Sequence, residues 1–339
     1  MQKNYNFTAI EKIEFRCVRD IPTGLAEYQV TSVIMNDGTD VCNETEFFSK
    51  MDVIPWRSDN KIIIPYIYKR DHDSVTIIAR HKPTQISAEF TITFDKWDLV
   101  FEDHFDGTEL NKNNWEYCPN FLRAKGYANY WKDDMSFVDG NSHLVSRAYA
   151  TGKITEDGKP ICYSGAIWSK NLAEFKYGYY EVSAKLHHKT GIWGAFWLVT
   201  GDMGDGENCP DDNSAVGGAE IDIFESLYNY NGVNSTVHRD GWAGKTKSLG
   251  YYDYITPIDV YDNEFHKFAL RWSPDEYVFL IDGQVTRRTN VFGVCNVPGY
   301  INLTTECGTW AGDWELKEGE CSDMLIDYVR VYQTPSDNK

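Results

Sequence analysis

The fold of this chain is decided by the stretch Glu220-Ile221-Asp222-Ile223-Phe224-Glu225, which places three carboxylates in a segment otherwise typical of a buried strand. Isoleucine and phenylalanine favour strands, and side chains in a strand alternate between two faces. Strict alternation would put Glu225 among the isoleucines, where an ionised carboxylate is very unfavourable. One extra residue, a β-bulge, would return Glu225 to the face of Glu220 and Asp222 and send Phe224 to the core. We therefore predict a bulged strand with all three acids on one face.

Carboxyl groups brought together on one face have specific chemistry. Their mutual repulsion raises at least one pKa. A retaining glycosidase needs a pair of them about 5–5.5 Å apart, one as nucleophile and one as protonated acid/base. A solvated acidic face is the alternative, but no basic residue interrupts the acids of this stretch.

The spacing resembles the E-x-D-x-x-E signature of glycoside hydrolase family 16 in its bulged form. The resemblance implies that Glu220 is the nucleophile and Glu225 the acid/base. It also implies that Asp222 tunes the nucleophile by hydrogen bonding.

Sequences on both sides of the motif extend the resemblance over about residues 97–333. They include Trp97–Gly107, Phe175–Leu186, Gly191–Leu198 and Asp327–Tyr332. The resemblance implies that residues 97–335 form a catalytic domain, a concanavalin A-like β-jelly roll with the substrate on its concave face. Gly194 is a departure, since laminarin-cleaving members of the family usually have proline at this position.

Residues 1–96 contain short β-rich runs separated by turn signals, such as Asn36-Asp37-Gly38, and carry no catalytic cluster. Strands at this spacing predict a small immunoglobulin-like β-sandwich that serves as an accessory or spacer domain. The whole chain is therefore expected to be all-β.

Six residues are candidates for substrate binding. Trp193 and Trp197 lie four apart, so alternation places them on the same face. Sugar stacking is expected of both, core packing being the alternative, and Phe196 is then a core residue. The full candidate set is Trp193, Trp197, His238, Trp242, Glu306 and Trp310. We expect His238 to hydrogen-bond the acid/base side or a sugar hydroxyl, and Glu306 either to select a hydroxyl pattern or to lie in the rim.

No metal or organic cofactor is expected in the chemistry. The family resemblance implies a structural calcium ion held by Asp327 with backbone groups near Gly140 and Glu102. Eight cysteines show no metal-binding spacing. Cys17 and Cys42 are a candidate disulfide, and a set of free thiols is the alternative.

Charge and hydropathy limit the partners. A net charge of −18 disfavours nucleic acid and anionic membranes. The sequence has no apolar run of 18 or more residues, which a transmembrane helix would need. We expect a monomeric protein that is secreted or at the cell surface. Since the sequence begins with a polar stretch, we expect the signal peptide of such a protein to be absent from it.

The expected function is that of a retaining endo-β-glycanase acting on β-1,3-glucan or mixed-linkage β-1,3/1,4-glucan. An enzyme acting on β-linked galactans, of the agarase, porphyranase or endo-β-galactosidase kind, is the alternative. A noncatalytic glucan-binding protein is disfavoured because all three carboxylates are present. A transglycosylase has the same residues, so the sequence does not separate it from a hydrolase.

Overall fold

The structure is a computed structural model of the chain. It describes residues 5–49, 60–120, 122–124, 126–204, 213–239, 241, 247–250 and 258–337. The chain divides into two compact units, Met1–Trp97 and Asp98–Lys339.

The first unit contains two antiparallel sheets, each of three strands within the described residues. One sheet has the order β1-β2-β4 and the other β3-β5-β6. The elements are β1 (Ile10–Asp20), β2 (Ala26–Met35), β3 (Thr45–Ser49), β4 (Lys61–Ile64), helix α1 (Tyr66–Asp71), β5 (Ser74–His81) and β6 (Ser87–Thr93). Apolar side chains of both sheets form one core, which includes Val30, Phe47, Ile64 and Ile77. An immunoglobulin-like topology for this unit stays a prediction.

The second unit is built on two larger sheets. Within the described residues, the first sheet has eleven strands, in the order β23-β22-β21-β16-β25-β12-β13-β10-β9, with β11 paired to β12 and β7 to β25. The strands are β7 (Asp98–Asp103), β9 (Leu122–Ala124), β10 (Ala128–Trp131), β11 (Ser136–Val138), β12 (Leu144–Ile154), β13 (Pro160–Ser164), β16 (Gly178–Lys185), β21 (His266–Trp272), β22 (Tyr277–Ile281), β23 (Gln284–Thr289) and β25 (Cys321–Gln333).

The second sheet of this unit carries the acidic stretch. Its eight strands in the described part of the chain have the order β20-β19-β18-β17-β24-β14-β8, with β15 paired to β24. They are β8 (Glu116–Tyr117), β14 (Ala166–Trp168), β15 (Glu174–Phe175), β17 (Ile192–Thr200), β18 (Glu220–Leu227), β19 (Gly232–Arg239), β20 (Lys247–Gly250) and β24 (Gly299–Cys307).

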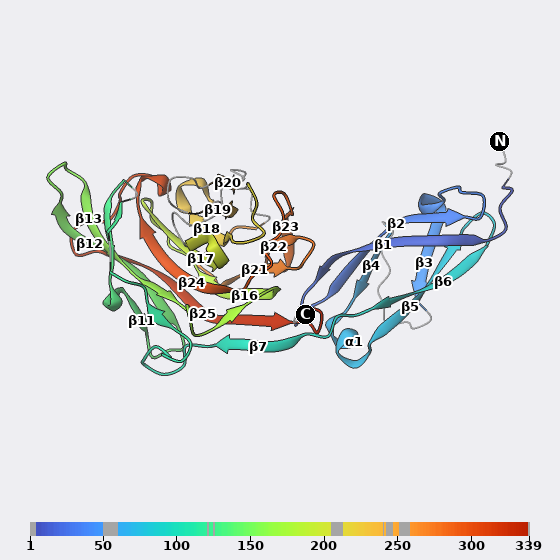
Figure 1. Cartoon of the computed structure of the whole chain (residues 1–339), viewed down its shortest axis with the longest axis horizontal. Coiled ribbons are helices and arrows are strands. Elements are labelled where there is room, and N and C mark those ends of the chain that lie inside the picture. The colour runs from blue at the N-terminus through green and yellow to red at the C-terminus, as the bar shows by residue number, and fades with distance from the viewer. Residues whose placement is uncertain are drawn as a thin grey trace. The chain divides into compact units, whose positions relative to one another are not determined.

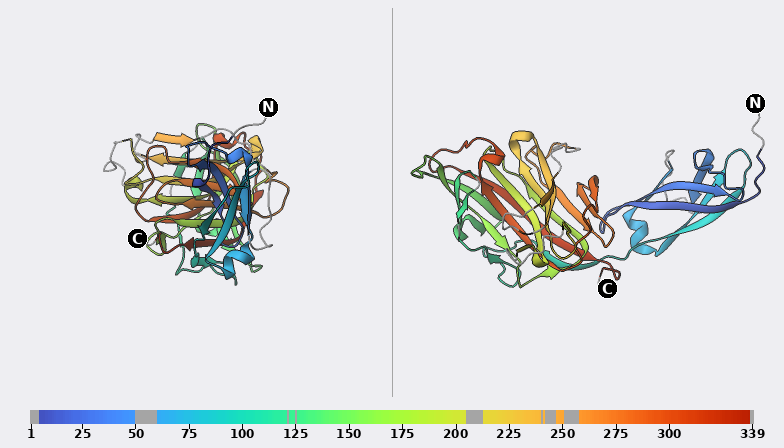
Figure 2. Two further views of the ribbon diagram at one scale, coloured as in Figure 1. Left: turned by 90° about the vertical axis from the view of Figure 1, so that its right-hand side faces the viewer. Right: turned by 45° about the horizontal axis from the view of Figure 1, so that its top comes forward.

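The two large sheets face each other, as Figures 1 and 2 show. Side chains of both sheets form a common apolar core between them. Phe196 of β17 and Ile221 of β18 contribute to it from the second sheet, and Val329 of β25 from the first. The rings of Phe224 and Phe268, one from each sheet, have their centroids 4.3 Å apart. The predicted jelly-roll sandwich is confirmed, and Phe196 and Phe224 are core residues as expected.

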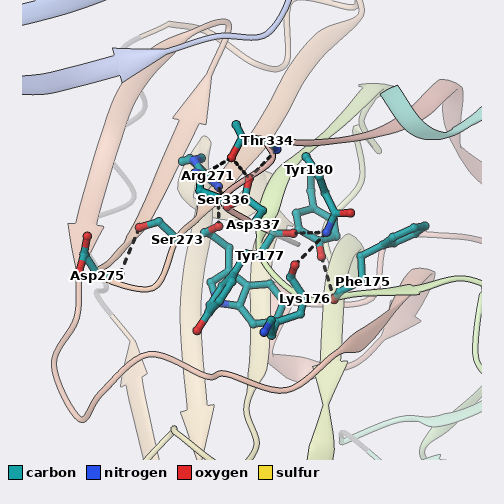
Figure 3. A network of polar contacts seen from close by, with 12 residues as sticks. Phe175, Lys176, Tyr177, Tyr180, Arg271, Ser273, Asp275, Thr334, Ser336 and Asp337 are labelled. Atoms are coloured by element: carbon teal, nitrogen blue, oxygen red, sulfur yellow. Dashed lines mark hydrogen bonds and ion pairs between the residues drawn. The ribbon is translucent and has the colours of Figure 1, made fainter. Parts of the chain in front are cut away.

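A buried polar network fixes residues 333–337 beside β21 (Figure 3). The Asp337 carboxylate accepts a hydrogen bond from Arg271 Nη1 at 2.9 Å and from the backbone N–H of Thr334 at 2.8 Å. Gln333 Nε2 donates to the carbonyl oxygen of Lys176 at 2.9 Å. These bonds hold the end of β25 against the turn that precedes β16.

No disulfide joins any of the seven cysteines in the described residues, so the Cys17–Cys42 disulfide is not formed. Cys42 is buried in the core of the first unit and accepts a hydrogen bond from Asn60 Nδ2 at 3.3 Å. None of the helices within the described residues has the length and hydrophobicity that membrane crossing requires.

Candidate active site

A β-bulge in β18 places the three acids on one face of the sheet. Glu220 and Asp222 pair with Val199 and Trp197 of β17, whereas Glu225 pairs with Ala195. The register with β17 therefore shifts between Asp222 and Glu225, and the register with β19 shifts over the same interval. Because paired residues of neighbouring strands share a face, the bulge returns Glu225 to the side of the other two acids.

The same face carries a continuous set of side chains across the sheet. The pairing places His238 opposite Glu220, and Asn234 opposite Glu225. On the other side of β17, the residues of β24 on this face are Tyr300, Asn302, Thr304 and Glu306. This is the face turned away from the core between the two sheets.

The environment of Glu225 favours its protonated form. Burial, together with the negative charges of Asp222 and Glu220, raises the pKa of the Glu225 carboxyl well above its usual range. The charge of His238 and a 3.3 Å hydrogen bond from Asn234 Nδ2 act in the opposite direction and are outweighed. A carboxyl group that stays protonated near neutral pH can serve as a general acid.

His238 provides a positive charge at the other end of the acidic stretch. Its Nε2 lies 3.0 Å from Asp222 Oδ2 and 3.7 Å from Glu220 Oε1. Burial disfavours the cation, but the hydrogen bond to Asp222 and the neighbouring carboxylates outweigh it and raise the pKa of His238 to about 9. These distances place the imidazole beside Asp222 and Glu220, and the predicted hydrogen bond to the acid/base side or to a sugar hydroxyl stays a prediction.

Glu220, Asp222 and His238 are also the one group in the described residues whose ligand atoms lie close enough, within 4.8 Å of one another, to hold a metal ion. A protonated imidazole has no free lone pair for a metal. With the pKa of His238 at about 9, the group is an ion-paired cluster at neutral pH.

Both predicted tryptophans lie on the acidic face, as the spacing indicated, but they are largely buried. Trp193 is 5% exposed and Trp197 is 9% exposed. Trp193 packs edge-to-face on Trp310 with centroids 5.3 Å apart, and Trp197 Nε1 donates to Thr304 Oγ1 at 3.0 Å. Their stacking on sugar rings stays a prediction, whereas their packing on the sheet face that carries the acids is observed.

Glu306 does not lie in the rim, because its side chain is buried beside Trp193. Its Oε1 accepts hydrogen bonds from Arg123 Nε at 2.9 Å and Nη2 at 2.5 Å. The Arg123 guanidinium in turn lies over the ring of Trp131, 4.5 Å from its centroid. Sequence analysis missed Arg123, which is 183 residues from its partner and follows no local pattern.

Gly194, the departure from the proline of related sequences, has a steric cause. A Cβ atom at this position would lie 2.4 Å from Met324 Sδ and 3.5 Å from His187 Cδ2. The Gly194 N–H also donates to Ser226 Oγ at 2.8 Å, a bond that proline cannot make. The glycine therefore follows from the packing of β17 against β25.

The residues predicted to bind calcium lie in or beside the eleven-stranded sheet. Glu102 Oε2 lies 3.2 Å from His104 Nε2 and 3.7 Å from Arg330 Nε, so its carboxylate faces basic groups. Asp327 lies where the register of β25 with β16 shifts, and Gly140 follows β11 with a φ of +77°. The contacts of the Glu102 side chain therefore give the calcium site no support, and the calcium prediction stays untested. The remaining candidate, Trp242, lies outside the described residues.

Comparison with known protein families covers the second unit. A family model described as "Beta-porphyranase A-D, GH16 domain" matches residues 97–334. Among curated proteins, the chain is similar to glucan endo-1,3-beta-glucosidase A1 of Niallia circulans, with 26% identity over 275 residues. The match covers 70% of this chain and 38% of that protein. It is also similar to beta-porphyranase C of Zobellia galactanivorans, with 25% identity over 70% of this chain and 78% of the relative.

Among solved structures, the chain is similar to the catalytic domain of an endo-1,3-beta-glucanase (laminarinase) from Thermotoga petrophila. The TM-score is 0.56 and the identity 26%, over 71% of this chain and 100% of that one. The chain spans about two fifths of the length of the Niallia relative and about a third of two Rhizobium meliloti glycanases that it also matches.

Proposed function

Because the chain belongs to glycoside hydrolase family 16, we propose that it hydrolyses internal β-glycosidic bonds of a polysaccharide with retention of configuration. The bulge of β18 carries this proposal, since it gathers Glu220, Asp222 and Glu225 on one face. Two carboxyl groups of different protonation state are what double displacement requires.

The reaction has two steps. In the first, the Glu220 carboxylate attacks the anomeric carbon while Glu225 donates its proton to the leaving oxygen, and a glycosyl-enzyme ester forms. In the second, Glu225 accepts a proton from water, which attacks the same carbon and releases Glu220. Asp222 and the His238 cation, 3.0 Å apart, orient the nucleophile and balance the charge beside it.

The proposed substrate is β-1,3-glucan or mixed-linkage β-1,3/1,4-glucan, on which several similar proteins act according to their names. A β-linked galactan is the second candidate. It is favoured by the porphyranase-type family model. We further propose a monomeric, secreted or cell-surface enzyme with no role for nucleic acid.

A product profile on laminarin, lichenan, agarose and porphyran tests the proposal. If the enzyme cleaves internal bonds, the length of at least one of these polymers should fall rapidly, and a series of oligosaccharides should appear as products. A protein that binds the polymers but releases no reducing ends would instead be a noncatalytic binding protein. Transfer to added acceptor sugars in preference to water would identify a transglycosylase.

Removal of residues 1–96 is expected to leave a folded, active enzyme. The second unit has its own core, and every acid, histidine and arginine described above for the site lies within it. The measurement is hydrolysis of soluble oligosaccharides by the truncated protein, with circular dichroism as the control for folding. A truncated protein that is folded yet inactive would show that the first unit takes part in the active site.

A further inference from the structure

Lys170 lies over two aromatic rings on the sheet face that carries the catalytic acids. It follows β14, and its Nζ lies 5.2 Å from the ring centroid of Trp168 and 5.5 Å from that of Tyr300. The two rings meet edge-to-face with centroids 5.8 Å apart. An ammonium group held above aromatic faces is attracted by their quadrupoles and stays available to an anion.

Strand pairing places this cluster next to the catalytic residues. Asn302 pairs with Trp197, which pairs with Asp222, and on its other side Asn302 pairs with Trp168. With neighbouring strands about 4.8 Å apart, Asn302 lies about 10 Å from Asp222 and Trp168 about 14 Å from it. Tyr300 has the same relation to Glu220 through Val199. A polysaccharide that crosses the strands at the acids therefore reaches this cluster.

Two hydrogen-bond donors of the cluster have no acceptor in the described part of the chain. Within the described residues, the Asn302 Nδ2 and Trp168 Nε1 atoms are buried and have no hydrogen-bond partner, and Asn302 is only 1% exposed. Lys170 forms no ion pair with any described residue, although the chain has a net charge of −18. Three partly buried arginines of this unit do pair with carboxylates: Arg123 with Glu306, Arg147 with Asp323 and Arg271 with Asp337.

Two carboxylates lie near the cluster without neutralising it. Glu174, opposite Tyr300, accepts a hydrogen bond from the backbone N–H of Asn171 at 3.0 Å. Glu116, opposite Trp168, lies in the edge strand β8 and is exposed. Neither forms an ion pair with Lys170 in the described structure.

We propose that Lys170, Trp168 and Asn302 form a subsite for an acidic substituent of the substrate, a sulfate ester or a carboxylate. The inference rests on the proposed function. The anionic oxygens would accept hydrogen bonds from the three donors, and the Tyr300 ring would pack against the sugar that carries the anion. Charge-assisted hydrogen bonds of this kind are stronger than those to a sugar hydroxyl.

The test compares matched charged and uncharged polymers. One pair is a sulfated β-galactan before and after chemical desulfation, and the other a uronate-containing β-glycan before and after carboxyl reduction. For each pair, kcat/KM on the charged polymer is divided by kcat/KM on its uncharged match. Lys170→Met is expected to lower this ratio by about 10-fold in the pair that carries the cognate anion. Lys176→Met is the control, because Lys176 Nζ lies over the Tyr177 ring at 5.1 Å and belongs to the network in Figure 3.

Binding of the same polymers to a Glu220→Gln protein, with and without Lys170→Met, separates this inference from the proposed function. If binding of a charged polymer depends on Lys170, the subsite is supported. It is supported even where the wild-type protein cleaves none of the polymers, because that failure would refute only the proposed function. An unchanged ratio for Lys170→Met in both polymer pairs, or equal loss of binding for charged and uncharged polymers, would overturn the subsite. So would failure of every charged polymer to bind.

Discussion

Glu220→Gln is expected to lower kcat on the cognate polymer by roughly 10⁴- to 10⁶-fold, the scale of loss seen when an enzyme loses its nucleophile. The amide keeps the size of the side chain but cannot form the glycosyl ester. Because Glu220 lies on the sheet face away from the core, we expect the fold and the melting temperature to change little. The measurement is the release of reducing ends by protein purified without contact with wild-type enzyme.

Glu220→Ala with added azide provides the matching control. Azide can attack from the side that the carboxylate occupied, so the expected product is an α-glycosyl azide, with activity restored on a substrate that has a good leaving group. Near-normal cleavage of polymer by Glu220→Gln would show that another group is the nucleophile.

Glu225→Gln is expected to reduce kcat/KM on polymer by about 10²- to 10⁴-fold, the usual contribution of general acid–base catalysis. A dinitrophenyl glycoside leaves without a proton, so the first step on this substrate is expected to be nearly normal. A burst of dinitrophenol followed by slow turnover is the expected signature, because the second step still lacks its general base.

The pH dependence provides a second measurement on Glu225. Its raised pKa keeps the acid protonated until the pH exceeds that pKa, and activity on polymer is then lost as the pH rises further. In Glu225→Gln this alkaline limb should disappear. Equal losses on polymer and on the dinitrophenyl glycoside, with the alkaline limb retained, would assign the acid role to another residue.

The bulge of β18 could be predicted from six residues, because only one arrangement keeps Glu225 out of the core while Phe224 enters it. The face shared by Trp193 and Trp197 likewise followed from alternation alone. These features depend on local patterns, and a strand imposes such patterns strictly.

Other features depend on contacts between distant strands, which a single sequence does not encode locally. The Arg123–Glu306 ion pair joins β9 to β24, and the contact of His238 with Asp222 depends on the register of β18 with β19. The burial of the two tryptophans follows from packing by residues such as Trp310. The sequence resemblance identified the acids of the site, but their partners required the assembled sheet.

The configuration of the first product tests the central claim most directly. Proton NMR during the first minutes of hydrolysis shows the anomeric signal of the new reducing end before mutarotation. If Glu220 attacks from the side opposite the leaving group, and water later displaces Glu220 from the side that the leaving group occupied, the β-anomer appears first. An initial α-anomer would mean a single displacement by water, with the two carboxyl groups about 6.5–9.5 Å apart, and would contradict the assignment of Glu220 as nucleophile.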